Sequence, residues 1–130
     1  MSIAVRYYSR SGNTKSVAEA IAKAAGVKAV SVDSAEAKLT EPADVLFIGG
    51  ALYAYGLDSH LKDYLSTLKK GDAKKAVVFS TSWVSKHAID LTKKALEEAG
   101  IPVETDSFYA RSKPSEDQLK AAAEFTKKYL

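Results

Sequence analysis

The fold of this chain is decided by the stretch Ile3-Ala4-Val5-Arg6-Tyr7-Tyr8-Ser9-Arg10-Ser11-Gly12-Asn13-Thr14. Its first six residues are mostly apolar, β-branched or aromatic, which predicts a strand buried on both faces of a sheet. The last six are polar and are expected to form a loop. Beyond them, apolar side chains recur at helical spacing up to Ala25, and Gly26 is placed to end the helix. The stretch therefore predicts the strand, loop and helix that begin a parallel crossover unit.

The alternation of strand and helix continues along the rest of the chain. Further strands are predicted at residues 27–32, 43–49, 75–80 and 103–110. The later helices are expected to begin at Asp58 or Ser59, at Ser85 and at Ser115, where Gln118 completes a capping box. Residues 51–57 are expected to form a loop. Five strands with helices on both faces predict an α/β fold, with a doubly wound parallel sheet in three α/β/α layers.

The composition limits the functions that the chain can have. A length of 130 residues with 46% hydrophobic side chains fits one domain, expected to span residues 1–130. The absence of cysteine excludes disulfides, thiol redox chemistry and Cys-ligated clusters, so a redox function needs an organic cofactor. The net charge is only +3 and the lysines are scattered, which argues against a nucleic-acid partner. Without an apolar run of about 20 residues or a signal pattern, we expect a cytoplasmic protein with no membrane partner.

A functional site is expected at the carboxyl ends of the central strands, because ligands of doubly wound sheets bind where the strand order reverses. The loops at these places are residues 9–14, 49–58 and 81–86. The first of them precedes a helix, whose exposed N–H groups and dipole attract anions. This position makes it the candidate phosphate-binding loop.

The residue types of the first loop suit a phosphate group. The hydroxyls of Ser9, Ser11 and Thr14 can donate to phosphate oxygens, and Gly12 lets a backbone N–H approach closely. Neither the Gly-Lys-Ser/Thr ending of triphosphate loops nor a three-glycine dinucleotide fingerprint is present. The alternative is an ordinary strand-to-helix turn, capped by Asn13 or Thr14.

At this loop the chain resembles the flavodoxin family, whose pattern is Ser/Thr-x-Ser/Thr-Gly-x-Thr. More loosely, the resemblance extends over the whole chain in the order and spacing of its elements. It implies a short-chain, flavodoxin-like member with the strand order 2-1-3-4-5 and with FMN as its cofactor. The phosphate of FMN is then expected at the loop Ser9, Arg10, Ser11, Gly12, Asn13 and Thr14.

The resemblance also implies two loops that hold the flavin ring. They are Ala51, Leu52, Tyr53, Ala54, Tyr55 and Gly56 after the third strand, and Thr81, Ser82 and Trp83 after the fourth. Aromatic side chains can stack on a flat, apolar ring, and Trp83 is favoured for this contact. Each tyrosine can equally fill the loop surface. By analogy with the family, the peptide beside Gly56 can reorient toward flavin N5.

The charge near the expected ring departs from the family. Flavodoxins usually carry a carboxylate-rich rim, whereas here Lys86 and His87 follow Trp83 and Asp58 is the only carboxylate near the second loop. A basic rim suits a higher redox potential or an acidic partner. The alternative is that Lys86 and His87 simply begin an exposed helix.

Several functions are compatible with these residues. The first is a monomeric electron carrier, in which FMN shuttles electrons between redox partner proteins, a reductase and an acceptor, without a catalytic side chain. The alternative is a small FMN-dependent oxidoreductase for a quinone or porphyrinogen-like substrate, because residues 48–56 resemble flavodoxin-like protoporphyrinogen oxidases. A flavin-free binding module is a third possibility. Neither histidine has a ligand partner at useful spacing, so no metal site is expected.

Overall fold

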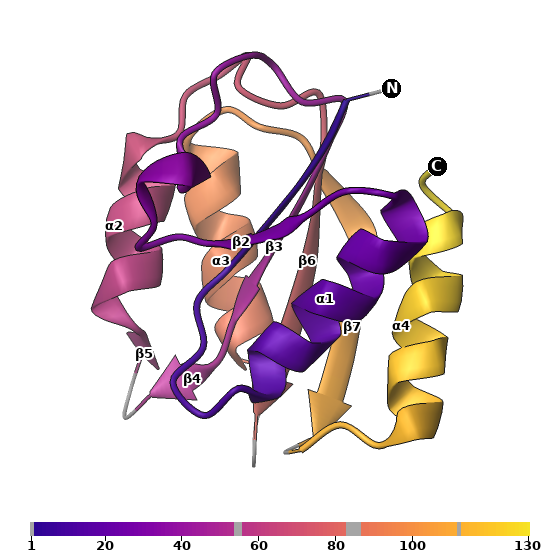
Figure 1. The fold of residues 1–130 in the computed structure, drawn as a ribbon. Coiled ribbons are helices and arrows are strands. Elements are labelled where there is room, and N and C mark those ends of the chain that lie inside the picture. The colour runs from indigo at the N-terminus through magenta and orange to yellow at the C-terminus, as the bar shows by residue number, and fades with distance from the viewer. Residues whose placement is uncertain (1, 54–55, 83–86, 112) are drawn as a thin grey trace.

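The computed structural model describes residues 2–53, 56–82, 87–111 and 113–130 (Figure 1). Its centre is a sheet of five parallel strands in the order β2-β1-β3-β6-β7. These strands are β1 (Ile3–Tyr7), β2 (Ala29–Ser31), β3 (Val45–Gly50), β6 (Ala76–Ser82) and β7 (Val103–Arg111). Counted within this sheet the order is 2-1-3-4-5, which confirms the predicted doubly wound, flavodoxin-like fold.

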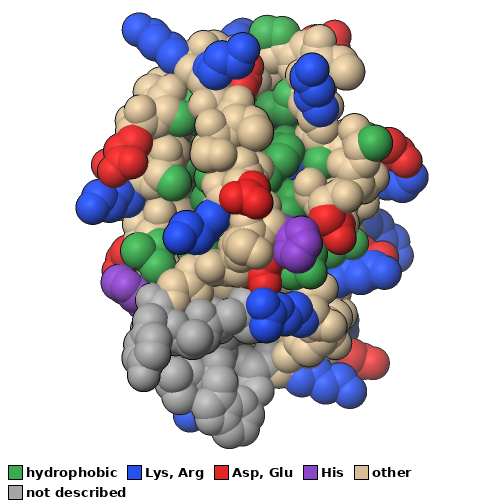
Figure 2. Space-filling view, turned by 90° about the vertical axis from the view of Figure 1, so that its left-hand side faces the viewer, with side chains coloured by type: hydrophobic (Ala, Val, Ile, Leu, Met, Phe, Trp, Pro, Cys, Tyr) green, Lys and Arg blue, Asp and Glu red, His purple; other side chains and the backbone are tan. Residues whose placement is uncertain are grey.

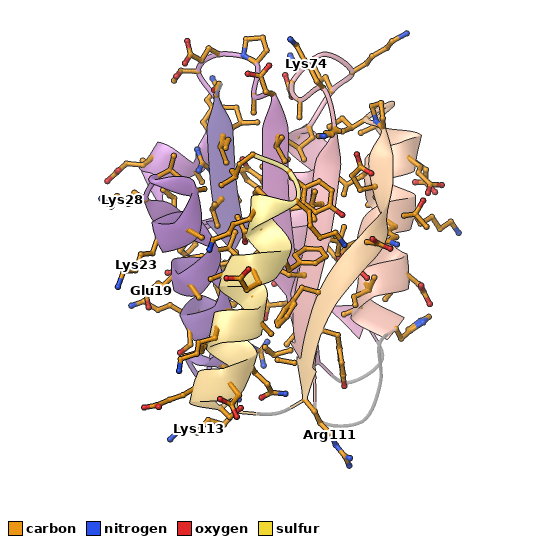
Figure 3. The ribbon with its side chains drawn as sticks, turned by 90° about the vertical axis from the view of Figure 1, so that its right-hand side faces the viewer. Glu19, Lys23, Lys28, Lys74, Arg111 and Lys113 are labelled. Atoms are coloured by element: carbon orange, nitrogen blue, oxygen red, sulfur yellow. The ribbon has the colours of Figure 1, made fainter. Side chains whose placement is uncertain are left out.

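Helices cover both faces of the sheet and give three layers (Figure 1). Helices α1 and α4 pack against each other on one face, as Figure 3 shows, and α2 and α3 lie on the other. Their bounds are α1 (Asn13–Ala25), α2 (Ser59–Thr67), α3 (His87–Glu98) and α4 (Glu116–Lys127), with a 3-10 turn η1 (Ala35–Ala37) after β2. None of the helices in the described part of the chain is long and apolar enough to cross a membrane.

The core consists of two apolar clusters separated by the sheet. All six residues of β3 are buried. Val45 and Phe47 belong to the cluster under α1 and α4, whereas Leu46 and Ile48 belong to the cluster under α2 and α3. Successive side chains of a strand point to opposite faces, so a strand covered on both faces must be apolar throughout. This requirement made the central strand recognisable in the sequence.

The predicted strand boundaries shift by one or more residues at several places, and two of the differences lie at the candidate site. Residues 51–57 do not form an open loop, because β4 (Leu52–Tyr53) and β5 (Gly56–Leu57) pair antiparallel. The fourth predicted strand does not end at residue 80 but continues to Ser82, because Thr81 and Ser82 pair with Ala110 and Arg111 of β7. Both differences arise from pairing between strands, which local residue preferences do not report.

The helix ends follow local signals closely. Ser115 caps α4, and a complete capping box with Gln118 is present as predicted. Asp58 caps α2 by accepting the backbone N–H of His60 at 2.9 Å. Gly26 ends α1 in the left-handed conformation, with φ of 74°. Each of these capping residues lies within four residues of the helix end that it determines.

Candidate functional site

The carboxyl ends of β1, β3 and β6 meet at one edge of the sheet, the lower edge in Figure 1. Tyr8, just after β1, donates its backbone N–H to the carbonyl oxygen of Gly49 at 3.2 Å. On the other side of β3, the Ser80 hydroxyl donates to the carbonyl oxygen of Gly50 at 2.6 Å. The chain segments after these strands therefore leave the sheet next to one another, where the strand order reverses.

The loop after β1 is closed by its own side chains. The Ser9 hydroxyl accepts the backbone N–H of Gly12 at 2.9 Å. Gly12 is the N-cap of α1 and has φ of 93°, a left-handed conformation that strains other residues. The alternative in which Asn13 or Thr14 caps this helix is therefore wrong. Because the turn ends at the left-handed Gly12, the helix begins at the next residue, Asn13.

Among the described residues, no side-chain cap or first-turn carboxylate neutralises the start of α1. Gly12 has no side chain to cap the helix, and the first turn contains no acidic residue. The backbone N–H of Asn13 reaches only the Ser11 hydroxyl, at a long 3.5 Å. A Cβ atom added to Gly12 would meet no atom of the described residues within 4 Å, so none of these residues fills the space beside Gly12. An open, uncapped helix N-terminus of this kind attracts anions.

A buried hydroxyl pair holds the start of α1 against the sheet. The hydroxyl oxygens of Thr14 and Thr81 lie 2.6 Å apart, and the two residues are 1% and 2% exposed. Either hydroxyl can donate, so each keeps capacity for a further bond. The pair fixes the first turn of α1 beside the end of β6, which brings the first and third predicted loops together.

The predicted ring-binding residues are only partly described. Ala51 and Gly56 are half-buried beside β4 and β5, and Thr81 and Ser82 end β6. Leu52 and Tyr53 form β4. Ala54, Tyr55 and Trp83 lie outside the described residues, so their contacts with a ring stay predictions, as does the reorientation beside Gly56.

The edge also carries an ion pair that the sequence did not predict. Arg10 places Nε 2.9 Å and Nη2 2.7 Å from Oδ2 of Asp58, whose side chain is only 2% exposed. Oδ1 of Asp58 accepts from the backbone N–H of His60 and lies 2.8 Å from Nδ1 of its ring. The His60 ring stacks on Tyr8 with centroids 4.4 Å apart. We call these four residues the Asp58 cluster; its only signal in the sequence was Asp58 as the single carboxylate near the second loop.

Basic side chains border the same edge. Lys86 lies outside the described residues, and the exposed His87 begins α3. Figure 3 shows that Arg111, at the end of β7, and Lys113 lie at this edge, whereas Lys74 lies at the opposite one. Both Arg111 and Lys113 are exposed. No group of three or more residues able to hold a metal ion occurs in the described part of the chain.

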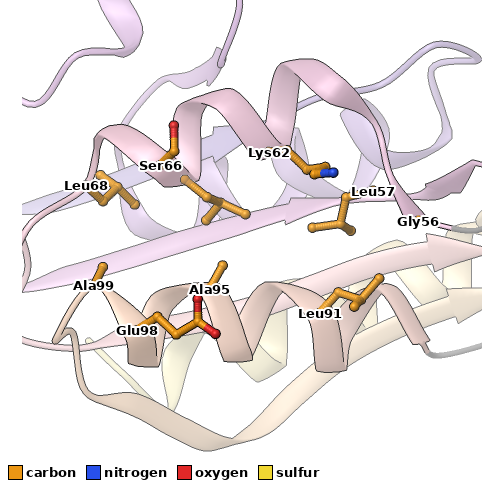
Figure 4. A pocket seen from close by; sticks show the side chains of 10 residues that line it. Gly56, Leu57, Lys62, Ser66, Leu68, Leu91, Ala95, Glu98 and Ala99 are labelled. Carbon is orange, nitrogen blue, oxygen red and sulfur yellow. The ribbon is translucent and has the colours of Figure 1, made fainter.

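A cavity of about 590 Å³ lies between α2 and α3 (Figure 4). Its lining is mainly apolar, with Leu57, Leu65 and Leu91, and Lys62 and Glu98 add opposite charges. No residue of the loop 9–14 lines it. The candidate anion site is therefore the start of α1 and not this cavity.

The sequence of this chain matches the model of one known protein family. The family model of the flavodoxin domain matches residues 4–122. The chain belongs to the flavodoxin family. No curated protein sequence matches it.

Solved structures have the same fold as this flavodoxin-family chain. A flavodoxin from the domain Archaea has 22% identity and a TM-score of 0.84, over 97% of this chain and 94% of that one. Flavodoxin 1 from Bacillus cereus has 22% identity and a TM-score of 0.78, over 98% and 97%. Rubredoxin oxygen:oxidoreductase from Desulfovibrio gigas has 13% identity and a TM-score of 0.86, over 98% of this chain but 34% of that one.

The Asp58 cluster makes the stability of this flavodoxin-family chain depend on pH. Burial tends to raise the pKa of the Asp58 carboxyl, but hydrogen bonds from the backbone and ring of His60 and from Arg10 outweigh it. The pKa of Asp58 therefore lies below its ordinary value of 3.8 in the folded protein. A lowered pKa gives stability that is complete above the unfolded-state pKa and is lost as pH falls through the folded one.

We expect replacement of Asp58 by asparagine to flatten the acid side of the stability profile. At pH 7, Asp58→Asn should lower the free energy of unfolding by about 1 kcal/mol, because the bond to Arg10 loses its charge. Between pH 6 and pH 3, wild type should then lose more stability than the variant, measured as the thermal midpoint. Glu97→Gln, which removes an exposed carboxylate, is the control. Equal losses in wild type and Asp58→Asn would show that Asp58 does not contribute.

Proposed function

We propose that this chain binds FMN and carries electrons between redox partner proteins. The supporting observation is the start of α1, which is uncapped, free of acidic side chains in its first turn and open beside Gly12. The Ser9 hydroxyl accepts from Gly12 and so keeps its own hydrogen to donate to a phosphate oxygen. The Ser11 hydroxyl is placed in the same way, and the backbone N–H of Asn13, whose contact with Ser11 is a long 3.5 Å, adds a further donor. Bound FMN supplies reversible one- and two-electron chemistry.

The other predicted contacts belong to the same proposal. The ring is proposed to lie between the β4–β5 hairpin, with Ala51 to Gly56, and the end of β6, with Thr81, Ser82 and Trp83. The Thr14–Thr81 pair ties the phosphate side of the site to the ring side. The guanidinium of Arg10 contacts Asp58.

The proposed role is that of a monomeric cytoplasmic carrier, with residues 1–130 as one domain. Its partners are a reductase and an acceptor, and no side chain acts as a catalyst. The basic side chains at the carboxyl edge, among them Arg111 and Lys113, favour a partner with an acidic surface. An oxidoreductase acting on a quinone or porphyrinogen-like substrate is the second candidate. It is favoured by the fold shared with the Desulfovibrio gigas oxidoreductase.

An absorption spectrum tests the cofactor. After incubation with FMN and desalting, the protein should keep bands near ~370 and ~450 nm, as bound oxidised flavin does. Riboflavin, which lacks the phosphate, should be retained less well. If no flavin is retained and micromolar FMN leaves the fluorescence of Trp83 unchanged, the proposal is wrong. Steady reoxidation of the reduced protein by a quinone would favour the oxidoreductase over the carrier.

A further inference from the structure

Arg10 stands in the candidate phosphate loop, and its side chain pairs with Asp58 at the start of α2. Its guanidinium contacts Oδ2 of Asp58 through two nitrogens, at 2.9 and 2.7 Å. Asp58 is 48 residues further along the chain and belongs to the start of α2. The ion pair therefore joins the loop after β1 to the segment after β5. Figure 2 views this side of the molecule and shows basic, acidic and histidine side chains close together beside the atoms drawn in grey.

The two oxygens of Asp58 have different partners. Oδ1 is engaged by His60, through its backbone N–H and through Nδ1 of its ring. Oδ2 is engaged by Arg10. The side chain of Asp58 is 2% exposed, whereas that of Arg10 is 60% exposed. Loss of Arg10 would therefore leave one oxygen of this carboxylate without its cationic partner.

The negative charge of the buried Asp58 carboxylate is expected to weaken the binding of an anion at the nearby loop. Arg10 is two residues before Gly12, and its side chain reaches Asp58. The distance between the Asp58 carboxylate and the loop is therefore no more than the length of one arginine side chain. At that range two negative groups repel each other, and the near-complete burial of the Asp58 side chain strengthens the repulsion. Neutralising Asp58 lowers this repulsion without placing a cation on the ligand itself.

We propose that Arg10 is a specificity-determining positioning residue that acts through Asp58. It neutralises the buried carboxylate and holds the phosphate loop to the start of α2, which lets the loop accept a phosphate dianion on its hydroxyl and backbone donors. This inference rests on the proposed function. It differs from a direct role of Arg10 as a phosphate ligand, and the two roles predict opposite results in a double variant.

The test compares FMN with riboflavin, which differ in the phosphate alone. Dissociation constants are measured by quenching of flavin fluorescence for wild type, Arg10→Gln, Asp58→Asn and the double variant. Arg10→Gln should weaken FMN binding by about tenfold or more and riboflavin binding by less than about twofold. Adding Asp58→Asn should restore FMN binding to within about threefold of wild type, because no uncovered charge is left.

Two further variants complete the design. Lys15→Gln removes a cation from the first turn of α1 that has no ion pair in the described part of the chain, and it should weaken FMN binding less than Arg10→Gln. Arg10→Lys keeps the charge but loses the two-nitrogen contact, so it should weaken FMN binding less than Arg10→Gln does. Asparagine remains a good N-cap at position 58, and urea unfolding confirms that each variant is folded.

The outcomes separate the inference from the function. A double variant that binds FMN as poorly as Arg10→Gln would overturn the inference, because Arg10 would then contact the phosphate directly. Equal weakening of FMN and riboflavin by Arg10→Gln would also overturn it, since the effect would be structural. Both results leave FMN binding by wild type intact. Failure of wild type to bind FMN would instead overturn the proposed function, and the inference with it.

Discussion

Replacing Gly49 with alanine is expected to lower the free energy of unfolding by about 3 kcal/mol or more. Gly49 is buried in β3 and lies opposite Phe79 of β6. A Cβ atom at Gly49 would lie 2.5 and 2.7 Å from ring carbons of Phe79 and closer still to its carbonyl oxygen. Phe79 is fully buried, and its backbone is fixed by the central strands, so neither can move away cheaply.

Gly50 provides the matched control for this prediction. It is the next residue of β3 and is also buried, but a Cβ atom there would meet mainly the end of the Leu61 side chain, at 2.6 Å. A flexible side chain can move, so Gly50→Ala should lower the free energy of unfolding by only about 1 kcal/mol. Urea unfolding measures both variants. If Gly49→Ala is as stable as wild type, the close approach of β3 and β6 is wrong.

Replacing Asn13 with aspartate should separate the stability of the fold from the affinity for phosphate. Asn13 is the first residue of α1, and the change alters its charge with almost no change in shape. A carboxylate at a helix N-terminus stabilises the helix by about 0.3–1 kcal/mol. The same charge repels a phosphate at that place, and we expect FMN binding to weaken by about tenfold or more. Riboflavin binding should change by less than about twofold.

The measurements for Asn13→Asp are the thermal midpoint of the flavin-free protein and the dissociation constants of FMN and riboflavin. The midpoint should stay constant or rise while FMN binding weakens. Gln118→Glu makes the same kind of change in the capping box of α4, and it controls for the general effect of one added negative charge. Unchanged FMN binding by Asn13→Asp would show that the phosphate does not lie at the start of α1.

Much of the fold could be predicted because its determinants are local. The apolar run of β3 reveals a strand covered on both faces, and Ser115 with Gln118 marks the start of α4 within four residues. The candidate phosphate loop could be identified for the same reason, since its hydroxyls and Gly12 are close together in the chain. The cap was predicted wrongly because the left-handed conformation of Gly12 depends on the turn that Ser9 closes.

The sequence by itself determined the alternation of strands and helices, the family and the candidate anion site at the start of α1. Only the tertiary structure decided the β4–β5 hairpin, the Thr14–Thr81 pair and the ion pair between Arg10 and Asp58. Thr14 and Thr81 are 67 residues apart, and Arg10 and Asp58 are 48 apart. Such contacts depend on how the sheet orders its strands, and residue preferences within a short window contain no information about that order.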